Sequence, residues 1–126
     1  MLIPGVAFAV AEVYQGSGRI YPYAELALAI FNIDRPILGR IQNDSVDSNE
    51  IDLEMVTHIC ENFRMEGNTA LCDVRVLDTP RGFMLRSILV DMDMQLHMRA
   101  TGVVDDHGRV SELKILYIDV GLSLTP

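Results

Sequence analysis

Short hydrophobic runs alternate with turn-forming residues along the first part of the chain. Residues 3–14 are rich in Val and aromatic residues and end in the turn-like segment 15–18 (QGSG), which predicts a first strand. Residues 37–41 (ILGRI) are a second, brief strand candidate. The polar stretch at residues 42–49 cannot pack a core, so we expect it to be a surface loop.

Two other segments have the spacing of helices. Apolar residues recur every three or four positions over residues 23–33, after Pro22 and before the stop at residues 34–36 (DRP). A second stripe predicts a helix over residues 80–92, with Thr79 as N-cap and Pro80 at its first position. The apolar positions of the two stripes are Leu26, Ile30 and Ile33, then Leu85, Ile88, Leu89 and Met92.

Two hairpins are predicted from paired runs of strand-forming residues. Residues 53–65 and 69–77 flank a Gly-Asn turn, and residues 94–104 and 109–120 flank the DDHG turn. The last run is apolar on both faces, so we expect it to be a central strand.

Together these elements predict an α+β fold. We expect a mostly antiparallel, β-barrel-like sheet of five to seven strands with two flanking helices, in a single domain covering residues 1–126. A chain of 126 residues with 49% apolar content is long enough to bury one hydrophobic core.

Charge narrows the set of partners. The formal net charge is -8 and no cluster of basic residues occurs, so duplex nucleic acid is not an expected partner. A small anionic ligand stays open, because one or two arginines in a pocket can oppose the global charge. No apolar run approaches the ~20 residues of a membrane span, and no basic residue precedes the opening apolar stretch, so we expect no membrane association.

Neither cysteines nor acidic residues indicate a metal or cofactor. Cys60 and Cys72 are the two cysteines, and they are expected to be reduced core residues on neighbouring strands. Acidic residues cluster near turns, at Asp91, Asp93 and the pair 105–106, where solvated caps are commoner than cation sites. We therefore predict no metal site and no cofactor.

Four segments, in this order, resemble those of the prohead (capsid-maturation) proteases of tailed phages. They are residues 18–22 (GRIYP), 51–58, 76–82 (VLDTPRG) and the closing LKILYIDV. The Leu-Asp-Thr-Pro-x-Gly piece before an amphipathic helix is the most specific of the four. The resemblance covers residues 18–120 and implies the fold of these proteases, which is distantly similar to that of the herpesvirus assemblins.

The resemblance also implies two catalytic residues that this chain lacks. In the enzymes a histidine lies in a Gly-x-x-x-His-Pro piece and a nucleophilic serine in a Ser-Ser-Arg-Gly-like piece. On this sequence they fall on residues 39–44 and 99–102, so Asn43 replaces the base and Ala100 or Arg99 replaces the nucleophile. Loss of both in a serine protease costs on the order of 10^6 in turnover. The chain is therefore expected to be a pseudoenzyme.

The resemblance leaves two functions open for such a pseudoenzyme. It acts with phage capsid or scaffold proteins in head assembly, or it holds a small, nucleotide-like anion, such as a signal of host defence. Candidate ligand-binding residues near the former active site are Arg40, Asn43, Arg99 and Thr101. The protein would act in the cytoplasm of an infected bacterial host or in the virion, and a homo-oligomer is compatible with its apolar content.

The alternative is an active endopeptidase of capsid maturation with a displaced nucleophile. Thr101 and His58 are the fallback catalytic residues. His97 is the other histidine near Thr101, but four residues along a strand separate side chains by about 13 Å. A base for Thr101 would have to come from another part of the chain.

Overall fold

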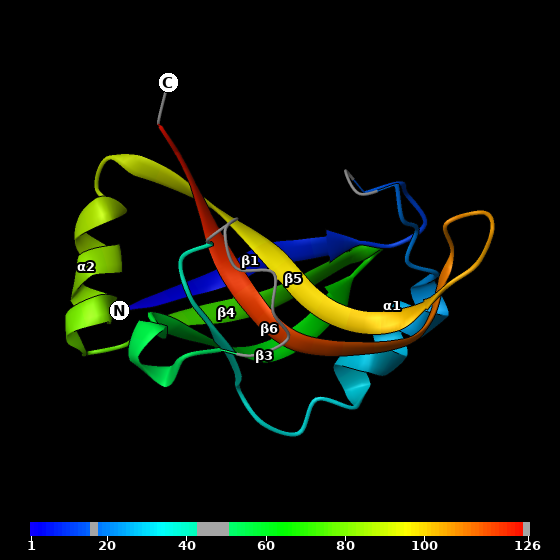
Figure 1. Cartoon of the computed structure of the whole chain (residues 1–126), viewed down its shortest axis with the longest axis horizontal. Helices are drawn as coiled ribbons and strands as arrows, with labels where there is room; N and C mark the ends of the chain where they lie inside the picture. Colours follow the sequence, from blue (N-terminus) through cyan, green and yellow to red (C-terminus); the bar gives the residue numbers. More distant parts are fainter. Residues whose placement is uncertain (16–17, 43–50, 125–126) are drawn as a thin grey trace.

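The structure, a computed structural model, describes residues 1–15, 18–42 and 51–124. In this part of the chain it contains two α-helices, one short 3-10 helix and six strands (Figure 1). In chain order they are β1 (Leu2–Val10), α1 (Tyr23–Phe31), β2 (Ile37–Gly39), η1 (Leu53–Met55), β3 (His58–Glu66), β4 (Thr69–Val76), α2 (Pro80–Ile88), β5 (Met92–Val104) and β6 (Val110–Leu124).

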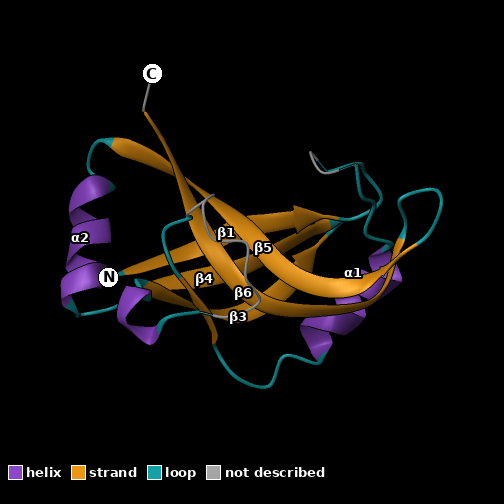
Figure 2. Ribbon diagram, in the orientation of Figure 1, coloured by secondary structure: helices purple, strands orange, loops and turns teal. Residues whose placement is uncertain are grey.

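The strands form two antiparallel sheets. Four of them make a sheet in the order β1-β4-β3-β2, and β5 and β6 make a long two-stranded ribbon. The ribbon crosses the four-stranded sheet at an angle, and α1 and α2 lie toward opposite ends of the molecule (Figure 2). The α+β class, the mostly antiparallel pairing, the two helices and both hairpins are therefore confirmed.

The predicted barrel-like closure is wrong, because the two sheets do not join into a barrel. The short strand β2 has three residues and cannot pair along the fifteen residues of β6. Just after β2, Gln42 donates to the Val120 carbonyl at 2.7 Å and Val120 donates to the Arg40 carbonyl at 2.8 Å. Strand β6 is therefore paired along one edge with β5 and touched at Val120 on the other, and it is not the central strand that its sequence predicted.

The core lies where the sheets and helices meet. Strand β4 buries every second residue, as a strand with one face in the core must, and Cys72 is one of these residues. Cys60 on the neighbouring β3 is also fully buried, and both thiols are free, as the sequence predicted. The hydrogen bond between the two thiols, together with burial, raises the pKa of Cys60.

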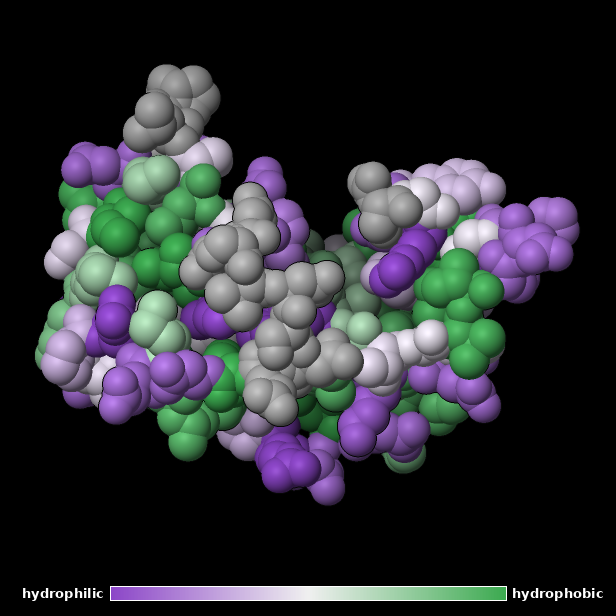
Figure 3. All heavy atoms as spheres, viewed as in Figure 1, coloured by the Kyte–Doolittle hydropathy of each residue, from purple (hydrophilic) through white to green (hydrophobic). Residues whose placement is uncertain are grey.

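Both helices begin where the sequence predicted, and both end earlier than predicted. Helix α2 is capped by Thr79, whose hydroxyl accepts from the Gly82 N–H at 3.1 Å, with Pro80 at the first position. It ends at Ile88, residues 89–91 form a turn, and β5 begins at Met92. Hydrophobic residues gather over α2 and the start of β5, whereas the tip of the β5–β6 hairpin is hydrophilic (Figure 3).

Two predicted strands are too long. The first ends at Val10 because the chain turns at Glu12, which has a left-handed φ of 65°. The segment predicted as a strand from residue 53 begins as the 3-10 helix η1, capped by the Asp52 side chain, and the strand proper starts at His58. The predicted surface loop at residues 42–49 lies, after Gln42, outside the described residues.

Candidate functional site

A buried carboxylate on β6 organises the region where the sequence placed the candidate site. Asp119 lies opposite His97 on β5, and the Asp119 side chain is 5% exposed. Oδ2 is 2.7 Å from Arg99 Nε, and Oδ1 accepts from Arg99 Nη2 at 3.2 Å. Two contacts from one guanidinium to one carboxylate fix both side chains more firmly than a single contact would.

Arg99 is also held by an aromatic ring. Its guanidinium carbon lies 4.5 Å from the centre of the Tyr117 ring, and the β5–β6 register places these two residues directly opposite each other. The charged head of Arg99 is thus bound on its edge by Asp119 and on its face by Tyr117.

Arg40 reaches the same carboxylate through its backbone. Its N–H donates to Asp119 Oδ1 at 3.2 Å, and the residue as a whole is buried. Gly39 permits this approach, because a Cβ there would overlap the Ile118 carbonyl oxygen and the His58 ring. The structure therefore brings Arg40 and Arg99 together around Asp119.

The other two candidate ligand residues are placed differently. Thr101 is exposed on β5, two residues beyond Arg99, and pairs across the ribbon with Lys114. Asn43 lies outside the described residues.

His58, a fallback catalytic residue, is fully buried and bonded at both ring nitrogens. Nε2 is 2.8 Å from the Ile118 carbonyl oxygen, which can only accept, so Nε2 carries the hydrogen. Nδ1 is then the acceptor for the Thr57 hydroxyl, at 2.7 Å. Burial lowers the pKa of His58, because it disfavours the charged ring. This pair has the contact of a nucleophile and its base, but Thr57 is 1% exposed, so the pair is not open to the surface.

Two polar side chains, His97 and Gln42, lie near Gly121, where β5, β6 and the end of the β2 segment meet. A Cβ on Gly121 would fall 2.6 Å from His97 Nε2 and 3.1 Å from Gln42 Oε1, so both side chains lie against this glycine. His97 is exposed and Asp119, opposite it, is buried. This arrangement puts an accessible imidazole beside the Asp119 cluster.

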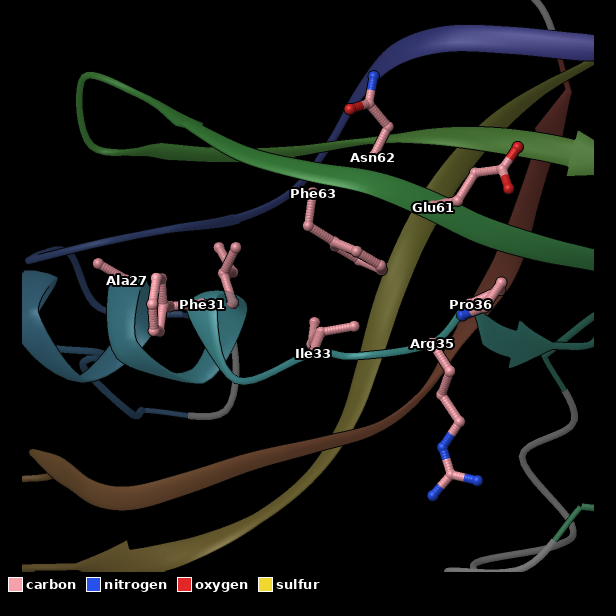
Figure 4. Close-up of a pocket in the computed structure, with 9 residues that line it drawn as sticks. Ala27, Phe31, Ile33, Arg35, Pro36, Glu61, Asn62 and Phe63 are labelled. Carbon is pink, nitrogen blue, oxygen red and sulfur yellow. The ribbon is translucent and has the colours of Figure 1, made fainter.

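Two hollows lie beside α1. The larger, about 870 Å³, is a groove between β2 and β6. The smaller, about 580 Å³, lies between α1 and β3 and shares residues 33, 35 and 36 with the groove. In the smaller hollow the Phe63 ring points toward Ile33, whereas the Arg35 side chain points away (Figure 4).

The described residues contain no group of three or more metal-ligating side chains and no helix long enough to cross a membrane. Asp105, one of the acidic turn residues, caps its own turn by accepting from the backbone N–H groups of His107 and Arg109 at 2.8 and 3.0 Å. The bond from Arg109 is the larger cause that lowers the pKa of Asp105.

Sequence reasoning missed Asp119 and Tyr117. Asp119 is the one charged residue in the apolar run 115–120, and a charge in such a run is rarely buried without a partner. That signal could have marked it as a member of the site before the structure was known.

Taken together, the crossed ribbon, the four-stranded sheet and the two helices form the fold of a viral capsid-assembly protease. The solved structure that shows this likeness is the bacteriophage T4 capsid assembly protease, gp21, with a TM-score of 0.79 and 20% sequence identity. The match covers 96% of this chain and 90% of that chain. No family model and no curated protein matches the sequence. The predicted prohead-protease-like fold is thus confirmed.

Proposed function

We propose that this chain is a catalytically inactive relative of the phage capsid-assembly proteases that binds a capsid or scaffold protein without cleaving it. The fold it shares with a capsid assembly protease supports the head-assembly context. Such a protein would act in the cytoplasm of the infected bacterium or remain in the virion.

The arrangement around Asp119 carries the proposal. At the positions where the resemblance expects a nucleophile, Ala100 has no hydroxyl and Arg99 is bound to Asp119 and Tyr117. If the arginine of the Ser-Ser-Arg-Gly piece is instead placed on Arg99, its serines fall on His97 and Met98. Neither placement supplies a hydroxyl, and without nucleophile and base turnover falls by roughly 10^6.

The same arrangement favours a protein partner over a small anion. The Arg99 guanidinium already holds a carboxylate of this chain, so an anionic ligand would have to displace Asp119 to use it. Displacement would leave Asp119 buried without its partner, which is costly. Arg40 and Arg99 are therefore proposed as residues that keep the former cleft in shape, rather than as ligands for phosphate.

The test is incubation of the purified chain with the capsid and scaffold proteins of a phage that encodes it. Size-exclusion chromatography with mass spectrometry should show a complex of intact proteins. Specific fragments that disappear in Thr101→Ala would overturn the proposal and favour the displaced-nucleophile peptidase.

Native mass spectrometry of protein from infected cells tests the small-ligand function. A bound small molecule that is lost in Arg99→Ala, without a bound head protein, would establish that function instead.

A further inference from the structure

Strands β2 and β6 run parallel and then separate. They are joined at one end by the two backbone bonds between residues 40–42 and Val120. Toward the N-terminal residues of both strands they diverge. The 870 Å³ groove lies there, between residues 37–38 of β2 and residues 113–117 of β6. Within the described part of the chain, no backbone hydrogen bond crosses the groove.

Two walls of the groove are free strand edges, and residue 29 of α1 and the segment 32–36 also line it. Strand β2 pairs with β3 on one side, and β6 pairs with β5 on one side, so the edges that face each other carry backbone groups with no strand opposite. Such edges readily accept a further strand. The wall on β6 spans five residues, or about 13 Å at ~3.3 Å per step, which is enough for a short extended segment.

The groove is apolar inside, and the charged residues at its rim are Arg35, Lys114 and Asp34. Its apolar lining includes Ile37, Leu38, Ile59 and Leu116, which are each half-buried. Leu116 is the extra residue of a β-bulge between the pairs Arg99–Tyr117 and Ala100–Ile115, and bulges of this kind redirect a side chain.

The rim carries an exposed lysine with no ion pair among the described residues. Lys114 is the only lysine in the chain, and it lines the groove opposite Arg35. Arg35 has Asp34 as its neighbour at 4.0 Å, with both side chains almost fully exposed. In a chain of net charge -8, this rim is a local site for a carboxylate.

We propose that the groove between β2 and β6 binds an extended polypeptide segment as an added strand, with apolar side chains on the groove floor and a carboxylate at Lys114. The inference rests on the proposed function, since the segment would belong to the head protein that this chain holds. It names the surface that holds the segment and the chemistry of the segment.

The binding test uses a fluorescent seven-residue peptide that alternates valine with glutamate and is blocked at both ends. It should bind the wild-type chain in an anisotropy titration. The same peptide methylated on alternate backbone nitrogens should bind at least about tenfold more weakly, because it cannot complete the strand bonds. Equal binding of the two peptides, or no binding of either, would contradict the proposal.

Variants locate the peptide. Leu38→Asp and Leu116→Asp should abolish binding, whereas Leu53→Asp, at an exposed residue that does not line the groove, should leave it unchanged. Lys114→Glu should weaken binding up to about fivefold, the effect of one exposed charge pair. Circular dichroism melting identifies any variant that fails to fold, and Lys114, being exposed, should not be among them.

The single lysine allows a direct check of position. Carbodiimide coupling should join the peptide carboxylate to Lys114, as mapped by mass spectrometry, and Lys114→Arg should abolish that product while keeping the binding. Coupling confined to the N-terminal amine would contradict the proposal. A concentration-dependent dimer that Leu38→Asp removes would show instead that a second copy of the chain occupies the groove.

The strand-binding groove and the proposed function can fail separately. If the complex with the intact capsid or scaffold protein survives Leu38→Asp, the groove inference fails and the proposed function stands. If the head protein is cut, the proposed function fails, while the peptide experiments still decide whether the groove binds a strand.

Discussion

Arg99 and Asp119 lie diagonally across the β5–β6 ribbon and are joined by two contacts, Nε to Oδ2 at 2.7 Å and Nη2 to Oδ1 at 3.2 Å. The Arg99 side chain is 18% exposed and that of Asp119 is 5% exposed, so water screens this pair little. A pair in this position does more to fix the local shape of the β5–β6 ribbon than the surface salt bridge that such an arginine usually makes.

Neutralising the carboxylate should therefore destabilise the fold strongly. Asp119→Asn leaves the Arg99 charge in a largely buried site without its counter-ion, and we expect a loss of about 3 kcal/mol in the free energy of unfolding. Urea denaturation measures it. The matched control is Glu61→Gln, which breaks a more exposed ion pair with Arg75. The Arg75 side chain is 50% exposed and that of Glu61 is 30% exposed, so the loss should be less than ~1 kcal/mol. Equal losses in the two variants would show that burial does not set the strength of the Arg99 pair.

Gly39 should tolerate no side chain, because β2, β6 and His58 meet there. An alanine Cβ would overlap both the Ile118 carbonyl oxygen and His58 Nε2, which are themselves hydrogen-bonded. We expect Gly39→Ala to cost at least ~2 kcal/mol in urea denaturation. Gly102→Ala is the milder comparison, since its Cβ would meet Val110 Cγ1 at 2.8 Å and the Ser111 carbonyl oxygen at 3.0 Å, against 1.8 Å from the Ile118 carbonyl oxygen at Gly39. A Gly39→Ala protein as stable as Gly102→Ala would contradict the close approach.

Local signals explain which parts of the fold the sequence could predict. Gly67 with Asn68, and the turn that ends at Gly108, mark both hairpins, and Thr79 with Pro80 marks the start of α2. Neighbouring residues determine these features, so a single sequence contains them. The absence of a barrel depends instead on how far β2 extends beside β6, which no local pattern encodes.

The site could be predicted only in part for the same reason. The resemblance directed attention to Arg40 and Arg99, which the structure brings to one carboxylate, but it gave no indication of that carboxylate. Asp119 was detectable as a lone charge in an apolar run. The groove was not, because it arises where two strands far apart in sequence diverge.

Asp73 should make the four-stranded sheet sensitive to strong acid. It lies on β4 between two β-bulges, and accepts from the Gly5 N–H at 2.9 Å, from Asn62 Nδ2 at 2.9 Å and from Arg64 Nη1 at 3.1 Å. Gly5 and Asn62 both have left-handed φ angles, which these bonds help to hold. The side-chain bond from Asn62 is the largest cause that lowers the pKa of Asp73 to about 2.

Because the folded-state pKa of Asp73 is depressed, its contribution to stability is present above the unfolded value of 3.8 and is lost as the pH falls toward 2. Asp73→Asn should lower stability at neutral pH and flatten the pH dependence between these values. Thermal melts at a series of pH values from 5 downward measure this. Asp78→Asn, at an exposed residue, is the control and should keep the wild-type slope.

His58 should give a second, separate loss of stability at higher pH. Burial lowers its pKa in the folded state below the ordinary histidine value of 6.5, so below that pH the unfolded chain binds more protons than the folded chain. Stability from the neutral, doubly bonded ring is therefore complete above 6.5 and falls as the pH drops below it.

Urea denaturation at pH 8, 7, 6 and 5 should show this slope in the wild-type chain. His58→Gln should be less stable at pH 8, because the bonds to Thr57 and Ile118 are disturbed, but its stability should change less between pH 7 and 5. His107→Gln changes an exposed histidine in the hairpin turn and should keep the wild-type slope. If His58→Gln keeps that slope as well, the buried ring is not the group whose protonation weakens the fold.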